Sequence, residues 1–113
     1  VDMLNGRAVQ LSADGEFVRQ FGRLGDTAGA FSRPKDVAVD SAGNVYVSDG
    51  LLAAVQVFSP TGEYLGFIGR EDPRDPDSAP LFQAPAGLTI SQGRLYVVDR
   101  CRGLFVFQLP GQE

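Results

Sequence analysis

Aspartates recur at one kind of position where they could do chemistry. Asp49 and Asp99 each follow a short run of strand-like residues, and Asp2 holds the equivalent place in the repeated pattern. Carboxylate oxygens are the ligands that a hard cation such as Ca²⁺ prefers, so a ring of them could hold a metal. Aspartates also accept hydrogen bonds from backbone N–H groups in tight connections. Because this aspartate belongs to a repeated unit, we favour the structural role and predict no metal site.

Arg33 and Lys35 lie with Asp36 at the entry to an expected strand, and Arg100 and Arg102 lie in the loop that follows Asp99. Loops on a rigid scaffold carry much of the binding chemistry of proteins, and side chains of this kind could together hold an anionic group. The alternative is a solvated loop, which carries charge by default. Cys101 lies between two arginines and could be a reactive thiol, although a free, inert thiol is the simpler interpretation. The candidate binding set is Arg33, Lys35, Asp36, Asp49, Asp99, Arg100 and Arg102.

Several kinds of catalytic chemistry are missing from the sequence. The 113 residues contain no histidine and one cysteine. A Ser-His-Asp triad, an imidazole base, a zinc site with histidine ligands and a pair of zinc-binding cysteines are therefore excluded. We predict no catalytic residues and no cofactor, which favours a protein that is not an enzyme.

Charge and hydropathy limit the partners. The net charge is −4, from 10 basic and 14 acidic side chains. Proteins that bind nucleic acid usually present a basic surface, so we predict no nucleic acid partner. No apolar run approaches the roughly 18 residues that a membrane span needs, so we also predict no membrane insertion.

One sequence pattern occurs twice. Residues 36–49 read DVAVDSAGNVYVSD, and residues 87–99 read GLTISQGRLYVVD. Residues 2–23 also align with residues 49–70 without a gap, through an aspartate, an S-x-x-G-E turn and a closing Gly-Arg. Self-similarity of this kind indicates a repeat architecture.

Each unit has the pattern of four β-strands. In the best-defined unit these cover residues 36–40, 44–49, 55–58 and 64–69, with the SAGN turn placing Gly43 at a positive φ. Aromatic residues at strand positions are expected to pack between units, namely Phe58, Tyr64, Tyr96, Phe105 and Phe107. Alternating valines are expected to face packed interior, namely Val37, Val39, Val45, Val47, Val55 and Val57.

The ordered set of motifs resembles the NHL repeat of six-bladed propellers. The resemblance rests on Phe-x-x-Pro, Val-Ala-Val-Asp, Gly-Asn-Val-Tyr-Val-x-Asp, Val-x-Val-Phe and Gly-Glu-aromatic. It implies an all-β fold, a β-propeller of NHL type with four-stranded antiparallel blades. The Asn and Arg that usually follow the aspartate are present as Asn5 and Arg7, but Leu52 and Ala54 replace them in the next unit. The resemblance also suggests a bacterial location outside the cytoplasm.

The expected strands amount to little more than two blades, so we predict an incomplete ring. Residues 1–30 would end one blade, residues 31–70 form a complete blade, residues 71–81 an insertion loop and residues 82–113 the three inner strands of a final blade. The open blade edges should pair with the rest of the same propeller chain or cause self-association. Residues 104–109 (LFVFQL) are the strand most prone to this.

These features favour a non-catalytic propeller module that binds or scaffolds a protein or small ligand through its loop rim. The alternative is a fragment of a metal-dependent propeller enzyme, lactonase-like or lyase-like, whose other site residues lie outside this chain. RNA binding, which occurs in some NHL proteins, conflicts with the acidic charge balance.

Overall fold

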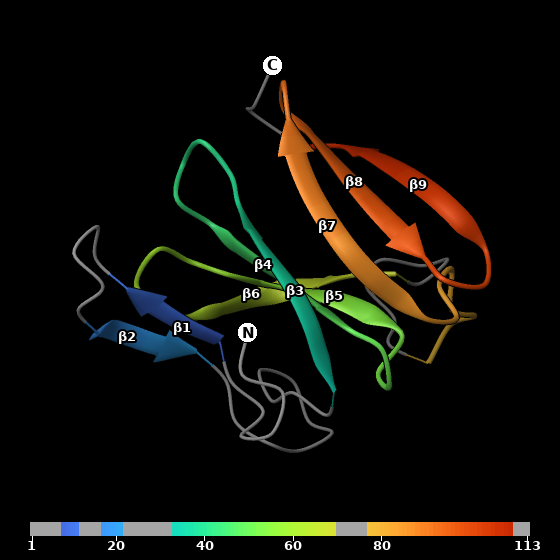
Figure 1. The fold of residues 1–113 in the computed structure, drawn as a ribbon, viewed down its shortest axis with the longest axis horizontal. Helices are drawn as coiled ribbons and strands as arrows, with labels where there is room; N and C mark the ends of the chain where they lie inside the picture. Colours follow the sequence, from blue (N-terminus) through green and yellow to red (C-terminus); the bar gives the residue numbers. More distant parts are fainter. Residues whose placement is uncertain (1–7, 12–16, 22–32, 70–76, 110–113) are drawn as a thin grey trace.

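The computed structural model describes residues 8–11, 17–21, 33–69 and 77–109. All regular elements in these ranges are β-strands, which confirms the all-β class (Figure 1). No helix in the described ranges has the length and hydropathy to cross a bilayer. The strands are β1 (Ala8–Leu11), β2 (Phe17–Phe21), β3 (Pro34–Val39), β4 (Val45–Asp49), β5 (Ala54–Phe58), β6 (Tyr64–Ile68), β7 (Pro85–Ser91), β8 (Arg94–Asp99) and β9 (Gly103–Gln108).

The described strands form three antiparallel sheets whose strands follow chain order. They are β1-β2, β3-β4-β5-β6 and β7-β8-β9. These sheets of two, four and three strands match the strand grouping that the repeat predicts. Their assignment to successive blades of one ring stays a prediction, as do the segment boundaries, and residues 70–76 of the insertion loop lie outside the described residues.

The turn between β3 and β4 forms because its residues supply both the conformation and the acceptors that it needs. Gly43 has a φ of 90°, in the left-handed region that glycine adopts without strain. Asp40 Oδ1 accepts the backbone N–H groups of Ala42 and Asn44, both at 2.9 Å. Asp40 Oδ2 accepts the hydroxyl of Tyr46 at 2.9 Å. The sequence prediction of a turn at SAGN is therefore confirmed.

The first strand of each larger sheet carries the same irregularity. In the four-stranded sheet Pro34 pairs with Asp49, and the register shifts before the next pair, Asp36 with Ser48. In the three-stranded sheet Pro85 pairs with Asp99, and the register again shifts before the next pair. A β-bulge leaves one residue out of the ladder and increases the local twist. The bulge is thus part of the repeated unit.

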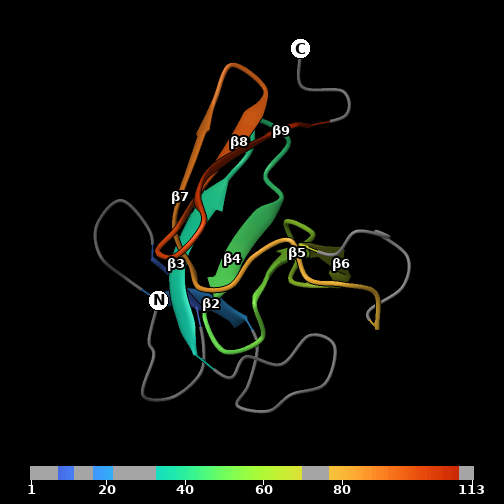
Figure 2. The same cartoon turned by 90° about the vertical axis from the view of Figure 1, so that its right-hand side faces the viewer.

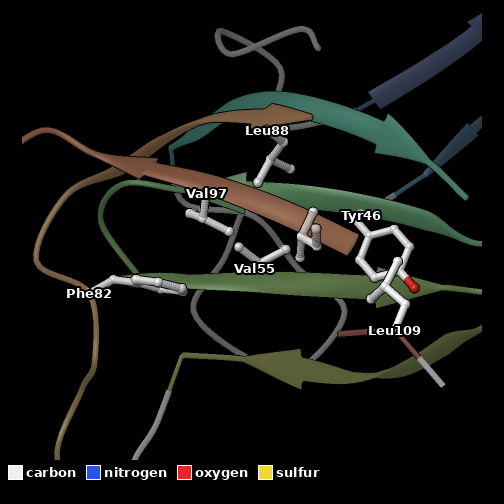
Figure 3. Packing of buried hydrophobic residues seen from close by; sticks show 7 residues of the cluster. Tyr46, Val55, Phe82, Leu88, Val97 and Leu109 are labelled. Atoms are coloured by element: carbon white, nitrogen blue, oxygen red, sulfur yellow. The ribbon is translucent and has the colours of Figure 1, made fainter. Parts of the chain in front are cut away.

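The two larger sheets pack face to face, with β3 and β7 side by side (Figures 1 and 2). Figure 3 shows side chains from both sheets meeting in this layer, among them Tyr46 and Val55 from one sheet and Leu88 and Val97 from the other. Phe82, from the connection before β7, is fully buried at one end of the layer. Burial of aliphatic and aromatic area between the sheets is the main stabilising contribution.

Aromatic rings extend this packed layer. The ring centroids of Phe82 and Phe105 are 5.0 Å apart and those of Phe82 and Phe107 are 5.9 Å apart, both edge-to-face. A Cβ at Gly69 would lie 2.8 Å from Phe82 Cδ2, so the glycine that closes the unit leaves room for this ring. Phe105 and Phe107 pack between the sheets as predicted, whereas Tyr64 is an exposed residue of β6.

The valine prediction is right for four residues and wrong for two. Val45, Val47 and Val55 are buried and Val57 is half-buried. Val37 is 36% exposed and Val39 is 56% exposed. Alternation along β3 directs Ala38 toward the layer between the sheets, so the two valines beside it face the other way.

Candidate functional site

The candidate site lies at one edge of the two larger sheets. Pairing of Pro34 with Asp49 and of Pro85 with Asp99 puts the starts of β3 and β7 at the same edge as the ends of β4 and β8. We call this edge, together with the β4–β5 and β8–β9 turns, the loop rim. It comprises residues 33–35, 49–53, 83–86 and 99–102.

Asp99 organises one half of the loop rim. Its Oδ2 accepts the N–H groups of Gln83 at 2.7 Å and Ala84 at 3.0 Å, and its Oδ1 accepts those of Cys101 and Arg102, both at 2.9 Å. Burial would raise the pKa of Asp99, but these four donors outweigh burial and hold the pKa below its ordinary value. The carboxylate therefore joins the chain entering β7 to the β8–β9 turn.

Asp49 has the same role in the other half. Both of its oxygens lie within hydrogen-bond distance of the N–H of Arg33, at 3.0 and 3.1 Å. Its Oδ1 also accepts the N–H groups of Leu51 at 3.1 Å and Leu52 at 3.0 Å. We call this arrangement the aspartate clasp. It matches the structural role favoured from the sequence, while Asp2, the third member, lies outside the described residues.

Three basic residues of the candidate set line one cavity between the two halves of the loop rim. Arg33 directly precedes β3, Lys35 lies at the start of β3, and Arg100 comes from the β8–β9 turn. The cavity has a volume of about 180 Å³. We call it the rim cavity, and its described lining is Arg33, Lys35, Gly50, Leu51, Ala84, Pro85 and Arg100.

The other members of the candidate set have different surroundings. Asp36 Oδ2 accepts the N–H of Leu88 at 2.9 Å, and so links β3 to β7. Arg102 Nη1 donates to the carbonyl oxygens of Pro80 and Leu81, at 3.0 and 2.9 Å. Arg33, Lys35 and Arg100 thus belong to the described lining of the rim cavity, whereas Asp36 and Arg102 do not. Cys101 is exposed.

Sequence reasoning missed the small residues that shape the rim cavity. Gly50 and Ala84 line it, and neither has a functional group that would mark it as a site residue. A comparison between units could have found them. Ala84 precedes the first proline of its strand as Arg33 does, and Gly50 follows the clasp aspartate as Arg100 does. Each basic residue in one unit thus corresponds to a small residue in the other.

A second cavity, of about 540 Å³, lies at the opposite edge of the sheets between the β3–β4 and β7–β8 turns. Asp40 is the charged residue in its described lining. Burial raises the pKa of Asp40, but hydrogen bonds from Tyr46, Asn44 and Ala42 outweigh burial, so the pKa lies below its ordinary value. Those bonds engage the carboxylate in the turn, and the other polar residues of the described lining, Ser41, Ser91 and Gln92, are uncharged.

Antiparallel sheets that repeat along the chain, pack face to face and carry loops at a shared edge define a repeat protein built from β-sheets. A stretch of 64 residues is 41% identical to the human (Homo sapiens) protein named NHL repeat-containing protein 3. The chain is therefore related to NHL-repeat proteins, which confirms the resemblance seen in the motifs. The match covers 56% of this chain and 18% of that protein. No family model matches the chain.

Proposed function

We propose that the chain is a non-catalytic NHL-repeat propeller module that binds a protein or small ligand through its loop rim. The observation that carries the proposal is the rim cavity, where Arg33, Lys35 and Arg100 from two sheets line one space. Folds of this kind host many functions, so the function depends on the site and not on the architecture.

The aspartate clasp supports binding because it fixes the loops that present these side chains. Asp49 and Asp99 each accept several backbone N–H groups from both sides of the rim. Loops held in this way lose little conformational entropy when a partner binds. The same bonds engage the carboxylates that a metal-dependent enzyme would use as ligands, which favours the binding module over the enzyme alternative.

A charge reversal tests the proposal. A library of random peptides displayed on phage would be selected on the immobilised chain, and the selected peptides measured on three proteins: the wild type, Arg100→Glu and Arg94→Glu. Arg94 is an exposed arginine at the other end of β8, so its reversal changes the net charge equally without altering the rim.

We expect the selected peptides to bind Arg100→Glu about tenfold more weakly than the wild type, and Arg94→Glu equally well, since opposite charges at a binding surface contribute on this scale. Peptides that bind all three proteins equally would contradict the proposal, as would a selection that enriches no peptide above background.

A further inference from the structure

We infer that the rim cavity is a binding site for a phosphate monoester group, an inference that rests on the proposed rim function and names its ligand class. The ligand would be either a phosphorylated side chain of a protein or a small phosphorylated molecule, and the same three basic side chains would contact its phosphate group.

The basic residues of the rim cavity are not required by the repeated fold. Arg33 and Ala84 hold equivalent places before the first proline of their strands, and both have an N–H bonded to the clasp aspartate. Arg100 and Gly50 likewise follow the clasp aspartates. The N–H of Arg100 donates to the carbonyl oxygen of Ala84, and the N–H of Gly50 donates to the carbonyl oxygen of Arg33. The backbone geometry thus forms equally well with alanine and glycine, so the side chains of Arg33 and Arg100 have no part in it.

The small residues of the lining leave room for the Lys35 side chain and for a ligand. A Cβ on Gly50 would lie 3.2 Å from Lys35 Cε, so the lysine stem lies directly over the glycine. Ala84 adds only a methyl group to the lining. A volume of about 180 Å³ is several times the roughly 30 Å³ that one water occupies in the liquid, which gives room for a phosphate group.

The charge in the lining is of one sign. None of the described residues that line the rim cavity is acidic, although the whole chain has a net charge of −4. The nearest carboxylates in sequence, those of Asp36, Asp49 and Asp99, all accept backbone N–H groups, and Asp49 and Asp99 are also buried. The cluster of three basic residues is therefore a local exception to an acidic chain, and it attracts anions.

The number and type of the basic groups favour phosphate over carboxylate. A phosphate monoester carries a charge of about −1.5 to −2 at pH 7 and has three acceptor oxygens. A carboxylate carries one charge and is satisfied by a single guanidinium that bonds to both of its oxygens. Arg33 and Arg100 come from different sheets and Lys35 adds a third group, so together they match an anion with more than one charge.

Titration calorimetry on the full chain at low salt tests the inference. The probes are inorganic phosphate, phenyl phosphate and, as the carboxylate of similar shape, benzoate. We expect both phosphates to bind and benzoate to bind about tenfold more weakly than phenyl phosphate. Arg33→Gln and Arg100→Gln should each weaken phenyl phosphate about tenfold, while the matched variant Arg94→Gln should leave its affinity unchanged.

A variant that leaves the net charge unchanged distinguishes binding inside the rim cavity from general electrostatic attraction to the surface. Ala84→Leu fills the rim cavity, so it should also weaken the binding of phenyl phosphate, whereas it would not affect a diffuse attraction of anions to the surface.

A phosphoserine peptide identifies the source of the phosphate group. Tighter binding of this peptide than of phenyl phosphate indicates a phosphorylated protein, and equal binding indicates a small phosphorylated molecule.

Three results would overturn the inference: absence of phosphate binding, benzoate affinity equal to that of phenyl phosphate, or equal losses in Arg100→Gln and Arg94→Gln. The proposed function would survive any of these if peptides selected on the wild type still lost affinity for Arg100→Glu. It would fail, independently of phosphate, if those peptides bound both proteins equally.

Discussion

Asp36 and Leu88 are joined across the two larger sheets, because Asp36 Oδ2 accepts the backbone N–H of Leu88 at 2.9 Å. Ser48 makes a second link beside it. Its Oγ donates to the carbonyl oxygen of Ala86 at 2.6 Å and accepts the N–H of Asp36 at 3.1 Å. These bonds lie next to the β-bulges and fix β7 against β3 and β4, and so they hold the two walls of the rim cavity together.

The two links should be energetically coupled. Asp36→Ala leaves the N–H of Leu88 without this acceptor, and Ser48→Ala removes a fully buried hydroxyl, so we expect each to cost about 1–3 kcal/mol of the free energy of unfolding. Because Ser48 also bonds to the backbone of Asp36, the double variant should cost less than the sum by about 0.5 kcal/mol or more. Urea unfolding of the four proteins measures this, and strictly additive losses would contradict the coupling.

Asp99 should make stability dependent on pH. Its pKa in the folded chain lies below the ordinary value of about 3.9, so its stabilising contribution is fully present above that pH and is lost as the pH falls through the lower, folded value. Asp99→Asn removes the charge and one acceptor for the four backbone donors. It should cost about 2–4 kcal/mol at pH 7.

Urea unfolding at pH 7, 5 and 3 would show this. The wild type should lose more stability between pH 5 and pH 3 than Asp99→Asn does. Glu63→Gln, the same change of charge at an exposed position, is the control and should follow the wild type. If Asp99→Asn had the same pH profile as the wild type, the stability of the aspartate clasp would not depend on the charge of Asp99.

Local features of the chain could be predicted from the sequence because they depend on nearby residues. The turn at Gly43 and the backbone N–H groups that donate to the Asp49 carboxylate are of this kind. The bond from Leu88 to Asp36 joins residues 52 positions apart, and no local pattern indicates it. The lining of the rim cavity could not be predicted from the sequence for a different reason, since Gly50 contributes space and no functional group.

The valines show where alternation alone is insufficient. It indicates which residues share a face of a strand, but it does not say which face another sheet covers. We expect Val47→Ala, at a fully buried position, to cost about 1–3 kcal/mol. Val39→Ala, at a position that is more than half exposed, is the matched control and should cost less than about 0.5 kcal/mol. Thermal unfolding compares them, and equal losses would mean that Val39 is covered in solution.

The three-stranded sheet has an apolar outer face. Leu104 is 61% exposed, and Val98 and Val106 are half exposed. By strand register Val98 and Leu104 hold the places that Ser48 and Val55 hold in the four-stranded sheet. The face of the four-stranded sheet that carries Val55 is the face that packs against β7–β9. The outer face of β7–β9 is therefore built like a surface that already packs against a sheet of this repeat.

A second copy of the chain should occupy this face when no other sheet is available. We expect light scattering at about 50 µM to show self-association, since exposed apolar faces and unpaired strand edges associate in this range. Leu104→Lys should reduce the association because a lysine cannot be buried there without a partner. Leu51→Lys, at an exposed rim position, is the control and should not. A monodisperse wild-type monomer would contradict this account, because it would mean that the outer face of β7–β9 is stable in water.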